Sequence, residues 1–529
     1  MQHIIKYFYA LVFTTVPLAL LAQPGWQLKD LSQDGVFGIS AIKAYAYLQT
    51  KPSKQVIVAV IDSGIDTAHV DLKKVIWTNS NEIPGNGLDD DHNGYIDDVH
   101  GWNFIGDEKG REDVSYLGNS NKHFFDSLGY TAVPAVYRDG YQSFKRMSEE
   151  YYGHVQNLTS FIADLRENRE TLNTITENIG KPQPVPDDFL KYKPHNEQER
   201  IVIGRVTKAL PSYKDLDQYR KLEIDTLITR ARYHLSHGLN GDLTNATPEL
   251  PADGTPDITN DPAGLVTQIN QTAFHGTHVA GIIAGTGKNG LGAMGIANNA
   301  RIMVLKVNSV IRELRDVNLA RAIRYAADNG ARVINLSMGK YYTWKKNIVD
   351  EAIKYAMSKN VLIVQAAMNN GIDLDKTTLY PNRNYSDGHP AGAYLVVGAS
   401  GLHNDSLLLA SFSNYGAMTV DLFAPGVEIY STIPGSTYEA WNGTSMAAPV
   451  VSGLAAMIMQ YFPDLTATEV KDIIIASVNK VQGNVRIQDE NGNNKFILFA
   501  KTCMSGGIVN AYNAVLLAEA HVADRARKY

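Results

Sequence analysis

A serine at the start of a strongly apolar segment is the residue best suited to nucleophilic chemistry. Ser445 stands in the stretch Asn442-Gly443-Thr444-Ser445-Met446-Ala447-Ala448-Pro449, and residues 450–462 are almost entirely apolar or small. A helix that is apolar on every side lies inside a large core, and its first turn has unpaired N–H groups and a positive dipole end. A serine placed there could attack a carbonyl group and have the resulting oxyanion stabilised. Alternatively, Thr444 or Ser445 only caps a core helix.

An aspartate and a histidine occupy comparable positions in two other segments. Residues 56–61 are apolar and mostly β-branched, which is typical of a strand buried on both faces, so Asp62 comes at its carboxyl end. Open α/β sheets place their sites at that edge. His275 begins a run of small and apolar residues that favours a closely packed helix, and the positive helix end opposes protonation of its imidazole. Alternatively, Asp62 only caps a turn and His275 has a purely structural role.

Together, Asp62, His275 and Ser445 supply the groups that acyl transfer requires. A serine hydroxyl becomes nucleophilic beside a basic imidazole, and a carboxylate fixes the tautomer of that imidazole. Two donors are expected to bind the oxyanion: the side-chain amide of Asn369, which follows an expected strand, and the backbone N–H of Ser445. Each of the three residues could have a purely structural role. That all three should nevertheless stand in this arrangement by coincidence is the weaker hypothesis.

A loop rich in Asp, Asn and Gly predicts a calcium site. Residues 89–97 follow the pattern D-x-D-x-N-G-x-x-D, with oxygen ligands at alternating positions and a glycine for the sharp turn. The expected ligands, completed by Asp98 or a residue elsewhere, are Asp89, Asp91, Asn93, Tyr95 and Asp97. His100 stands where an EF-hand has its bidentate glutamate. The loop is therefore expected to be a calcium loop that follows the EF-hand pattern only in part. A solvated acidic turn and the paired carboxylates of a glycosidase are the alternatives.

Strand and helix signals alternate over the segments that must position these residues. Short apolar runs predict strands at 55–61, 302–307, 332–337, 361–367, 394–399 and 419–423. Helical patterns are found at 312–329, 346–358 and 467–478. This alternation predicts an α/β fold built on a doubly wound parallel sheet.

Residues 112–260 differ in character from the segments on either side. Strand signals are absent there, and apolar residues recur at helical spacing over 144–179, 197–210 and 213–236. The α/β pattern resumes afterwards. We therefore expect an all-helical insertion, 112–260, between Asp62 and His275, inside a discontinuous α/β domain formed by 23–111 and 261–529.

The first 22 residues predict a secretory signal peptide. Residues 10–21 are apolar, Lys6 precedes them, and Leu20-Leu21-Ala22-Gln23 has the small residue of a cleavage site. The protein is therefore expected to be exported, either extracellular or periplasmic, without a stable membrane anchor; an uncleaved anchor is the alternative. Since Cys503 is the single cysteine, an internal disulfide is excluded.

The overall charge argues against some classes of partner. The 529 residues have a formal net charge of −6, with 44% hydrophobic and 20% charged residues, as is typical of a soluble globular protein. This balance gives no reason to expect nucleic acid or an anionic membrane as a partner.

Three motifs resemble those of the subtilisin-like serine proteases, peptidase family S8. They stand in the family's order and are Val60-Ile61-Asp62-Ser63-Gly64-Ile65, His275-Gly276-Thr277-His278-Val279-Ala280-Gly281 and Gly443-Thr444-Ser445-Met446-Ala447-Ala448-Pro449. The resemblance covers 55–111 and 265–515. It implies a sheet of the subtilisin type, and it implies that the side chain of Asn369 binds the oxyanion. It also implies that Ser337-Met338-Gly339 pairs with the substrate backbone, and that Ala367 and Met368 border the pocket for the residue before the cut bond.

Two positions deserve comparison with the family pattern. Met368 stands where the family usually has glycine, so its thioether side chain is expected to narrow the neighbouring pocket and to favour small substrate side chains. Asp71, in His69-Val70-Asp71-Leu72, matches a position that often ligates calcium in the family.

The sequence therefore predicts a secreted serine endopeptidase that acts on proteins or peptides through an acyl-enzyme. Ca²⁺ is expected as a structural ion, and no redox or organic cofactor is required. The alternative is a catalytically silent scaffold of the same fold that binds partners through the helical insertion. The intact set Asp62, His275, Ser445 and Asn369 argues against that alternative. The sequence makes no prediction of the oligomeric state.

Overall fold

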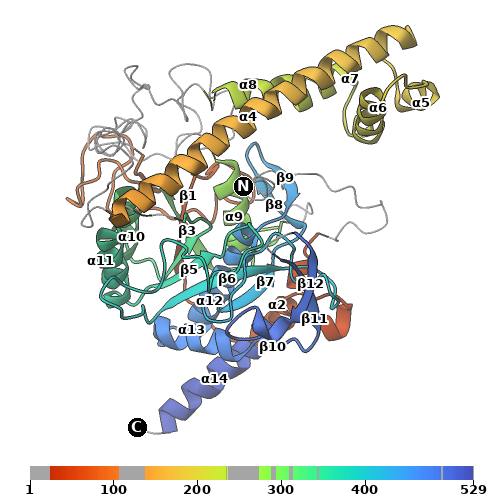
Figure 1. Ribbon diagram of the computed structural model, residues 1–529. Coiled ribbons are helices and arrows are strands. Elements are labelled where there is room, and N and C mark those ends of the chain that lie inside the picture. Colours follow the sequence, from red (N-terminus) through yellow and green to blue (C-terminus); the bar gives the residue numbers. More distant parts are fainter. Residues whose placement is uncertain are drawn as a thin grey trace. The chain divides into compact units, whose positions relative to one another are not determined.

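A nine-stranded, mainly parallel sheet lies at the centre of the computed structural model (Figure 1). The structure describes residues 24–105, 138–233, 235, 273–287, 293–308, 314–341, 343, 345–489 and 492–527, so the expected signal peptide lies outside the described part. The strands, in chain order, are β1 (Val56–Asp62), β2 (Gly101–Asn103), β3 (Ala300–Lys306), β4 (Val333–Leu336), β5 (Leu362–Ala366), β6 (Tyr394–Ser400), β7 (Leu422–Pro425), β10 (Asn479–Lys480) and β13 (Gly507–Ile508).

The order of the strands is that of a doubly wound sheet. From one edge to the other it runs β10-β13-β7-β6-β5-β4-β1-β3-β2, with β3 and β4 both parallel to β1. Strands that follow β4 in the chain extend the sheet on one side of β1, and β3 with β2 extends it on the other. The direction of winding therefore changes at β1, where ligand sites of open α/β sheets form. The predicted fold class is confirmed.

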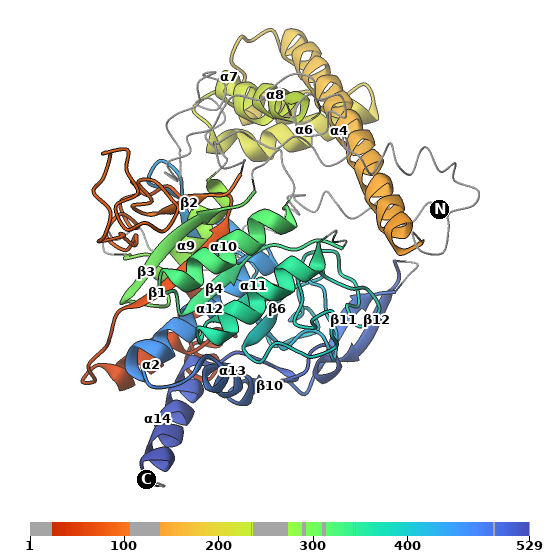
Figure 2. The same ribbon diagram turned by 90° about the vertical axis from the view of Figure 1, so that its left-hand side faces the viewer.

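Helices cover both faces of the sheet, as Figure 2 shows with α10 and α11 in front of it. Alternate residues of β1 enter two different cores: Val58 and Val60 pack on one side, and Ala59 and Ile61 on the other. This alternation follows from the two-residue period of a strand. The helices of this part of the chain are α1 (Leu31–Asp34), α2 (Ala41–Leu48), α9 (Phe274–Ala284), α10 (Asp316–Asp328), α11 (Lys346–Ser358), α12 (Thr444–Tyr461), α13 (Ala467–Ala476) and α14 (Ala511–Arg527).

Contacts within the chain separate a second compact unit, Val114–Ala246 with Val310–Arg312. Its described elements are helical: α4 (Arg138–Ile179), α5 (Pro186–Lys191), α6 (Glu197–Ala209), α7 (Leu216–Tyr219) and α8 (Thr226–Tyr233), with a π-helical segment, Arg220–Asp225, before α8. They share a core of their own, in which Leu172, Ile175 and Phe189 are at most 1% exposed. None of the described helices, in either unit, is long and apolar enough to cross a membrane.

Two small antiparallel ribbons lie outside the large sheet. They are β8 (Ile429–Ile433) with β9 (Thr437–Trp441), and β11 (Asn484–Gln488) with β12 (Asn494–Leu498). The first ribbon leads directly into Asn442 and the start of α12, so it connects the sheet to the helix that carries Ser445.

Candidate active site

Asp62 and His275 are in direct contact, although 213 residues separate them in the chain. Asp62 is the last residue of β1 and is 1% exposed, while His275 lies in the first turn of α9. Nδ1 of His275 lies 2.8 Å from Oδ1 and 3.0 Å from Oδ2 of Asp62. Because a carboxylate only accepts hydrogen bonds, Nδ1 carries the hydrogen in this pair and Nε2 is left as the basic nitrogen.

Two glycines allow α9 to approach the end of β1 closely. A Cβ atom at position 276 would lie 2.1 Å from the carbonyl oxygen of Gly64 and 3.3 Å from Cβ of Asp62. Gly64 has a φ of +98°, in the region that favours glycine. The contact between His275 and Asp62 therefore depends on the lack of a side chain at Gly276.

The environment of His275 acts on its pKa in two opposing ways. Burial lowers the pKa, whereas the negative charge of Asp62 and the hydrogen bond to it raise the pKa by more, so that the net shift is upward. Since 37% of the His275 side chain is exposed, the opposing effect of burial is weaker than in an enclosed pocket. The carboxylate thus favours the imidazolium form that a general base passes through.

Ser445 lies at the start of the buried helix α12, as the sequence predicted. Gly443 is the N-cap, and residues 446–460 of the helix are buried. The hydroxyl of Ser445 donates to the carbonyl oxygen of Ser337 at 3.1 Å, and the hydroxyl of Ser337 donates to the carbonyl oxygen of Ser445 at 2.8 Å. These reciprocal bonds join the end of β4 to the first turn of α12.

The structure therefore brings Asp62 and His275 together but gives Ser445 a different partner. Within the described part of the chain, Ser445 Oγ is bonded to Ser337 rather than to the imidazole. The helices that carry the two residues, α9 and α12, contact each other, and both contact β1. Hydroxyl rotamers are set by neighbours that a sequence pattern does not reveal, so the bond to Ser337 could not be predicted.

Asn369 lies next to Ser445, on the loop after β5. Its Oδ1 accepts hydrogen bonds from the N–H and the hydroxyl of Thr444, both at 2.9 Å. A Cβ atom on Gly443 would lie 3.5 Å from the N atom of Ser445 and 3.6 Å from Nδ2 of Asn369. The two candidate oxyanion donors thus border one small space beside Gly443.

The segments expected to bind substrate lie at the ends of β4 and β5. Ser337 and Met338 are 4% and 7% exposed, and a Cβ atom on Gly339 would lie 2.8 Å from a Leu379 methyl group. Ala367 is fully buried, and the adjacent Met368 has a φ of +73°. A positive φ is costly for a residue with a side chain, so the loop holds Met368 in a strained conformation.

Asn414 supports this loop and was not identified from the sequence. It is fully buried, and its Nδ2 donates to the carbonyl oxygen of Ala367 at 2.7 Å and to the hydroxyl of Tyr341 at 2.8 Å. Its Oδ1 accepts from the N–H groups of Asn370 and Ile372. No pattern around Asn414 signals this role, because the bonds span more than forty residues of chain.

His278, one turn after His275, has a different environment. It is fully buried, its Nε2 lies 3.0 Å from the carbonyl oxygen of Glu439, and its ring stacks on Trp441 at 4.5 Å between centroids. Burial lowers the pKa of His278 to about 3. It is therefore a neutral packing residue.

The predicted calcium ligands separate into two groups. Asp89 accepts hydrogen bonds from the N–H groups of Asn93 and Gly94, and Asp97 accepts from three N–H groups in the turn 85–87. The ring of Tyr95 packs edge-on against Trp102, Phe104 and Tyr325. The carboxylates of Asp89 and Asp97 therefore stabilise the backbone conformation of the loop, and the ring of Tyr95 packs the loop against its neighbours.

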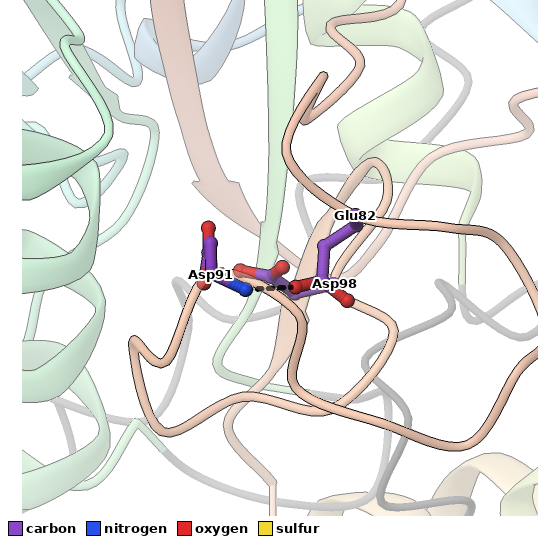
Figure 3. A group of neighbouring side chains, drawn as sticks. All are labelled: Glu82, Asp91 and Asp98. Carbon is purple, nitrogen blue, oxygen red and sulfur yellow. Dashed lines mark hydrogen bonds between the residues drawn. The ribbon is translucent and has the colours of Figure 1, made fainter.

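Asp91 belongs instead to a cluster with Glu82 and Asp98 (Figure 3). Within the described residues, this is the group whose carboxylate oxygens lie close enough together, within 4.8 Å, to share one ion. Oε2 of Glu82 is buried without a hydrogen-bond partner. An all-oxygen donor set with an unsatisfied carboxylate oxygen fits calcium. Asp98 was expected to complete the shell, but Glu82, outside the repeating pattern, was missed.

Asp71 occupies a separate position, and its carboxylate takes part in hydrogen bonds. Oδ1 accepts from the hydroxyl of Thr286 at 2.9 Å, and Oδ2 accepts from the hydroxyl of Tyr438 at 2.7 Å.

Comparison with known proteins identifies the family. A model described as the subtilase family matches residues 53–496. "Thermophilic serine proteinase" of Bacillus sp. (strain AK1) is 37% identical over 241 residues, which cover 46% of this chain and 52% of that protein. "Subtilisin Savinase" of Lederbergia lenta is 37% identical over 198 residues, which cover 37% of this chain and 67% of that protein. The chain spans about half the length of the first curated relatives that it matches, 52% and 48%.

Two solved protease structures are similar in sequence to part of this chain. The self-cleaved protease domain of PatA is 28% identical, covers 46% of this chain and 83% of that chain, and has a TM-score of 0.37. The prenylagaramide maturation protease PagA is 26% identical, covers 46% and 82%, and has a TM-score of 0.36. Because the family model extends over most of the sequence, including all three motifs, this chain belongs to the subtilase family.

Proposed function

We propose that this protein is an exported serine endopeptidase that cleaves peptide bonds with Ser445 as nucleophile, His275 as base and Asp62 as the orienting carboxylate. The observation that carries the proposal is the contact of His275 Nδ1 with Asp62, at 2.8 and 3.0 Å, which leaves Nε2 as the basic nitrogen. Family membership supports the same chemistry.

The first step requires the hydroxyl of Ser445 to leave its hydrogen bond with Ser337. The hydroxyl must turn about the Cα–Cβ bond from Ser337 toward the imidazole, between staggered positions of low energy. Catalytic hydrogen bonds are often looser without substrate and tighten when it binds. Oγ then bonds to the substrate carbonyl carbon as its proton passes to Nε2 of His275, and the C=O electron pair moves onto the oxygen.

The developing oxyanion is expected to occupy the space beside Gly443. There it would accept hydrogen bonds from Nδ2 of Asn369 and from the backbone N–H of Ser445, at the positive end of α12. Asp62 stabilises the imidazolium that exists at this stage.

Collapse of the intermediate breaks the peptide C–N bond. Nε2 of His275 gives its proton to the leaving amine nitrogen, and the acyl group remains on Ser445 Oγ. A water molecule then repeats the sequence: it loses its proton to Nε2, attacks the ester carbon, and releases the acid as Ser445 regains its proton. The reaction consumes one water and needs no oxidant, reductant or organic cofactor.

Proteins or peptides are the proposed substrates. An extended substrate would pair with Ser337-Met338-Gly339 as an added strand, since main-chain hydrogen bonds give affinity without dependence on sequence. Ala367 and Met368 would border the pocket for the residue before the cut bond, with Met368 restricting its size.

The remaining expectations are part of the same proposal. Residues 1–22 would direct export, 112–260 would form an insertion in a catalytic domain of 23–111 and 261–529, and the acidic loop would hold a structural Ca²⁺. The ion would lower the repulsion among buried carboxylates and take no part in bond cleavage.

Reaction with a serine-directed fluorophosphonate tests the nucleophile. Purified full-length protein should be labelled and should degrade casein, whereas Ser445→Ala should do neither while keeping its circular dichroism spectrum. Ser452→Ala is the control, because Ser452 is buried in the same helix and bonds to Asn335. Unlabelled wild-type protein that is fully folded would contradict the proposal and favour a silent scaffold.

A further inference from the structure

The side chain of Tyr341 links the two segments that are proposed to bind the substrate. Tyr341 comes shortly after Ser337-Met338-Gly339, and its hydroxyl donates to Oδ1 of Asn370 at 2.6 Å. Asn370 follows Ala367-Met368 on the loop after β5. The ring of Tyr341 therefore extends from the first segment to the second. Tyr341 and Met368 are both partly buried, and both pack against the same core.

A second connection between the segments runs through Asn414, which is fully buried. Its Nδ2 donates to the hydroxyl of Tyr341 at 2.8 Å and to the carbonyl oxygen of Ala367 at 2.7 Å. Its Oδ1 accepts from the N–H groups of Asn370 and Ile372, at 3.0 and 3.1 Å. Both hydrogens of the amide and its oxygen are thus bonded. A buried polar network whose members are all satisfied holds them in one arrangement.

Two hydrogen bonds fix the far end of the Tyr341 side chain. The hydroxyl donates to Asn370 and accepts from Asn414. If the ring turned aside, Nδ2 of the buried Asn414 would lose its acceptor, and a buried donor without a partner is costly. The ring is therefore held both at the backbone and at the hydroxyl, so it forms a fixed barrier.

Gln365 connects the same two segments at greater depth. It belongs to β5 and is fully buried, and its Nε2 donates to the carbonyl oxygen of Met338 at 3.4 Å. Its Oε1 accepts from the hydroxyl of Tyr394 at 2.8 Å. A Cβ atom on Gly339 would lie 3.3 Å from Nε2 of Gln365, so little space is left there. A substrate side chain that enters between the segments is limited by Gln365 on the buried side and by Tyr341 where its ring joins them.

We propose that Tyr341 closes the pocket for the residue before the cut bond, and so restricts the protein to substrates with a small side chain, such as alanine, at that position. The inference rests on the proposed peptidase function and adds a second barrier to that of Met368. The ring occupies space that a large substrate side chain needs, and its two hydrogen bonds oppose its displacement. Pocket size discriminates between substrates in this way.

Three variants test the ring and its hydrogen bonds separately. Tyr341→Ala removes the ring. Tyr341→Phe keeps the ring but deletes both hydrogen bonds that hold it, and Asn370→Ala deletes one of them from the other segment. Tyr355→Phe is the matched control, because it removes an exposed tyrosine hydroxyl that donates to Asp328 between α11 and α10. All are made in the full-length protein.

The measured quantity is kcat/KM on two peptides that differ only in the residue before the cut bond, alanine or phenylalanine. Tyr341→Ala should raise the phenylalanine-to-alanine ratio by about tenfold or more over the parent. Tyr341→Phe and Asn370→Ala should each raise it by about 2–10-fold, because the ring is then easier to displace. The double variant should show less than the product of the two effects, since both remove the same bond. Tyr355→Phe should keep the ratio of the parent.

The ratio separates a role in the pocket from a general structural role. Tyr341→Ala protein that cleaves both peptides at the parental ratio, whether or not both rates fall, overturns the inference and leaves the peptidase function standing. If Tyr341→Ala does not fold, as judged by circular dichroism, a parental ratio in both Tyr341→Phe and Asn370→Ala overturns it equally. Folded parent protein that cleaves neither peptide and does not react with the fluorophosphonate overturns the peptidase function and this inference with it.

Discussion

The side-chain oxygen of Asn369 accepts two hydrogen bonds from Thr444, one from its N–H and one from its hydroxyl, both at 2.9 Å. With Oδ1 engaged, the amide is fixed so that Nδ2 lies 3.6 Å from the point that a Cβ on Gly443 would occupy. Thr444 was seen in the sequence only as a candidate helix cap. In the structure it orients the proposed oxyanion donor.

Replacement of Asn369 should therefore reduce kcat with little change in KM. Asn369→Ala is expected to lower kcat by roughly 10²–10³-fold, the magnitude known for loss of one such donor from a subtilisin. Thr444→Val removes the hydroxyl but keeps the N–H, so its loss should be about 2–10-fold. Steady-state kinetics on a peptide substrate measure both. An effect of Asn369→Ala on KM alone would contradict the oxyanion assignment.

The acid limb of the pH profile should depend on Asp62. Burial lowers the pKa of His275, and Asp62 raises it by more, so kcat/KM should rise with pH through a value above the ordinary 6.5 as the imidazole loses its proton. Asp62→Asn removes the charge and leaves burial, so the limb should move to lower pH while the rate falls by about 10⁴-fold. A limb that stays in place would show that Asp62 does not control the imidazole.

Met368 is expected to restrict the substrate residue before the cut bond. Met368→Gly and Met368→Ala both remove the thioether, so each should raise kcat/KM for a phenylalanine substrate relative to an alanine substrate, by about tenfold or more. The two variants differ in the backbone. At a φ of +73° glycine is unstrained and alanine is not, so Met368→Gly should be more stable than Met368→Ala by about 1 kcal/mol. Unchanged preference in both variants would exclude Met368 from the pocket.

Elements whose signal is contained in a short stretch of sequence were predictable. The buried strands β1, β3, β4, β5 and β6 follow from continuous apolar runs, and their positions agree to within one or two residues. The edge strand β2 has three residues and includes Gly101 with a φ of +131°, so no periodicity marks it. The long helix α14 was missed although its composition favours a helix and its buried residues, Ala511, Ala514, Val515 and Ala518, recur at helical spacing.

The acidic loop of residues 79–98 shows why spacing alone does not determine which side chains meet. Alternating ligands assume a regular turn, but His92, Gly94 and Asp97 all have positive φ, and these reversals redirect the side chains between them. Asp97 consequently points to the turn 85–87 instead of to Asp91. The partner that replaces it, Glu82, comes from an earlier turn, which the pattern does not include.

Gly276 should be sensitive to the addition of a single methyl group. In Gly276→Ala the new Cβ would meet the carbonyl oxygen of Gly64 at 2.1 Å, so α9 or the turn after β1 must move. We expect the variant to lose about 1–3 kcal/mol in stability. Displacement of His275 from Asp62 should also disturb the proton transfer, so kcat/KM should fall by about 10²-fold. Gly483→Ala, where nothing lies within 4 Å, is the control. Equal denaturant midpoints for the two variants would contradict the packing argument.

Glu469 should stabilise the protein at neutral pH and lose that effect in acid. Its Oε2 accepts from the N–H and the hydroxyl of Thr466 in a capping box at the start of α13, and Oε1 lies 3.0 Å from Nε2 of His521 in α14. Burial raises the pKa of Glu469, but these hydrogen bonds lower it by more, to about 2 from an ordinary 4.5. A lowered pKa means that the folded protein stabilises the ionised carboxylate relative to the unfolded chain. The stabilisation is therefore complete above about pH 4.5 and disappears as the pH falls toward 2.

Denaturant unfolding of Glu469→Gln in the Ser445→Ala protein tests this dependence. At pH 7 the variant should be less stable by about 1–2 kcal/mol, the usual range for a lost cap, and the difference should shrink steadily below pH 4.5. Glu351→Gln is a matched control, because Glu351 is 61% exposed and pairs with Lys354 on the surface of α11, where an ion pair contributes less than about 1 kcal/mol. A difference for Glu469→Gln that persists unchanged to pH 3 would show that its effect comes from helix shape and not from the charge of the carboxylate.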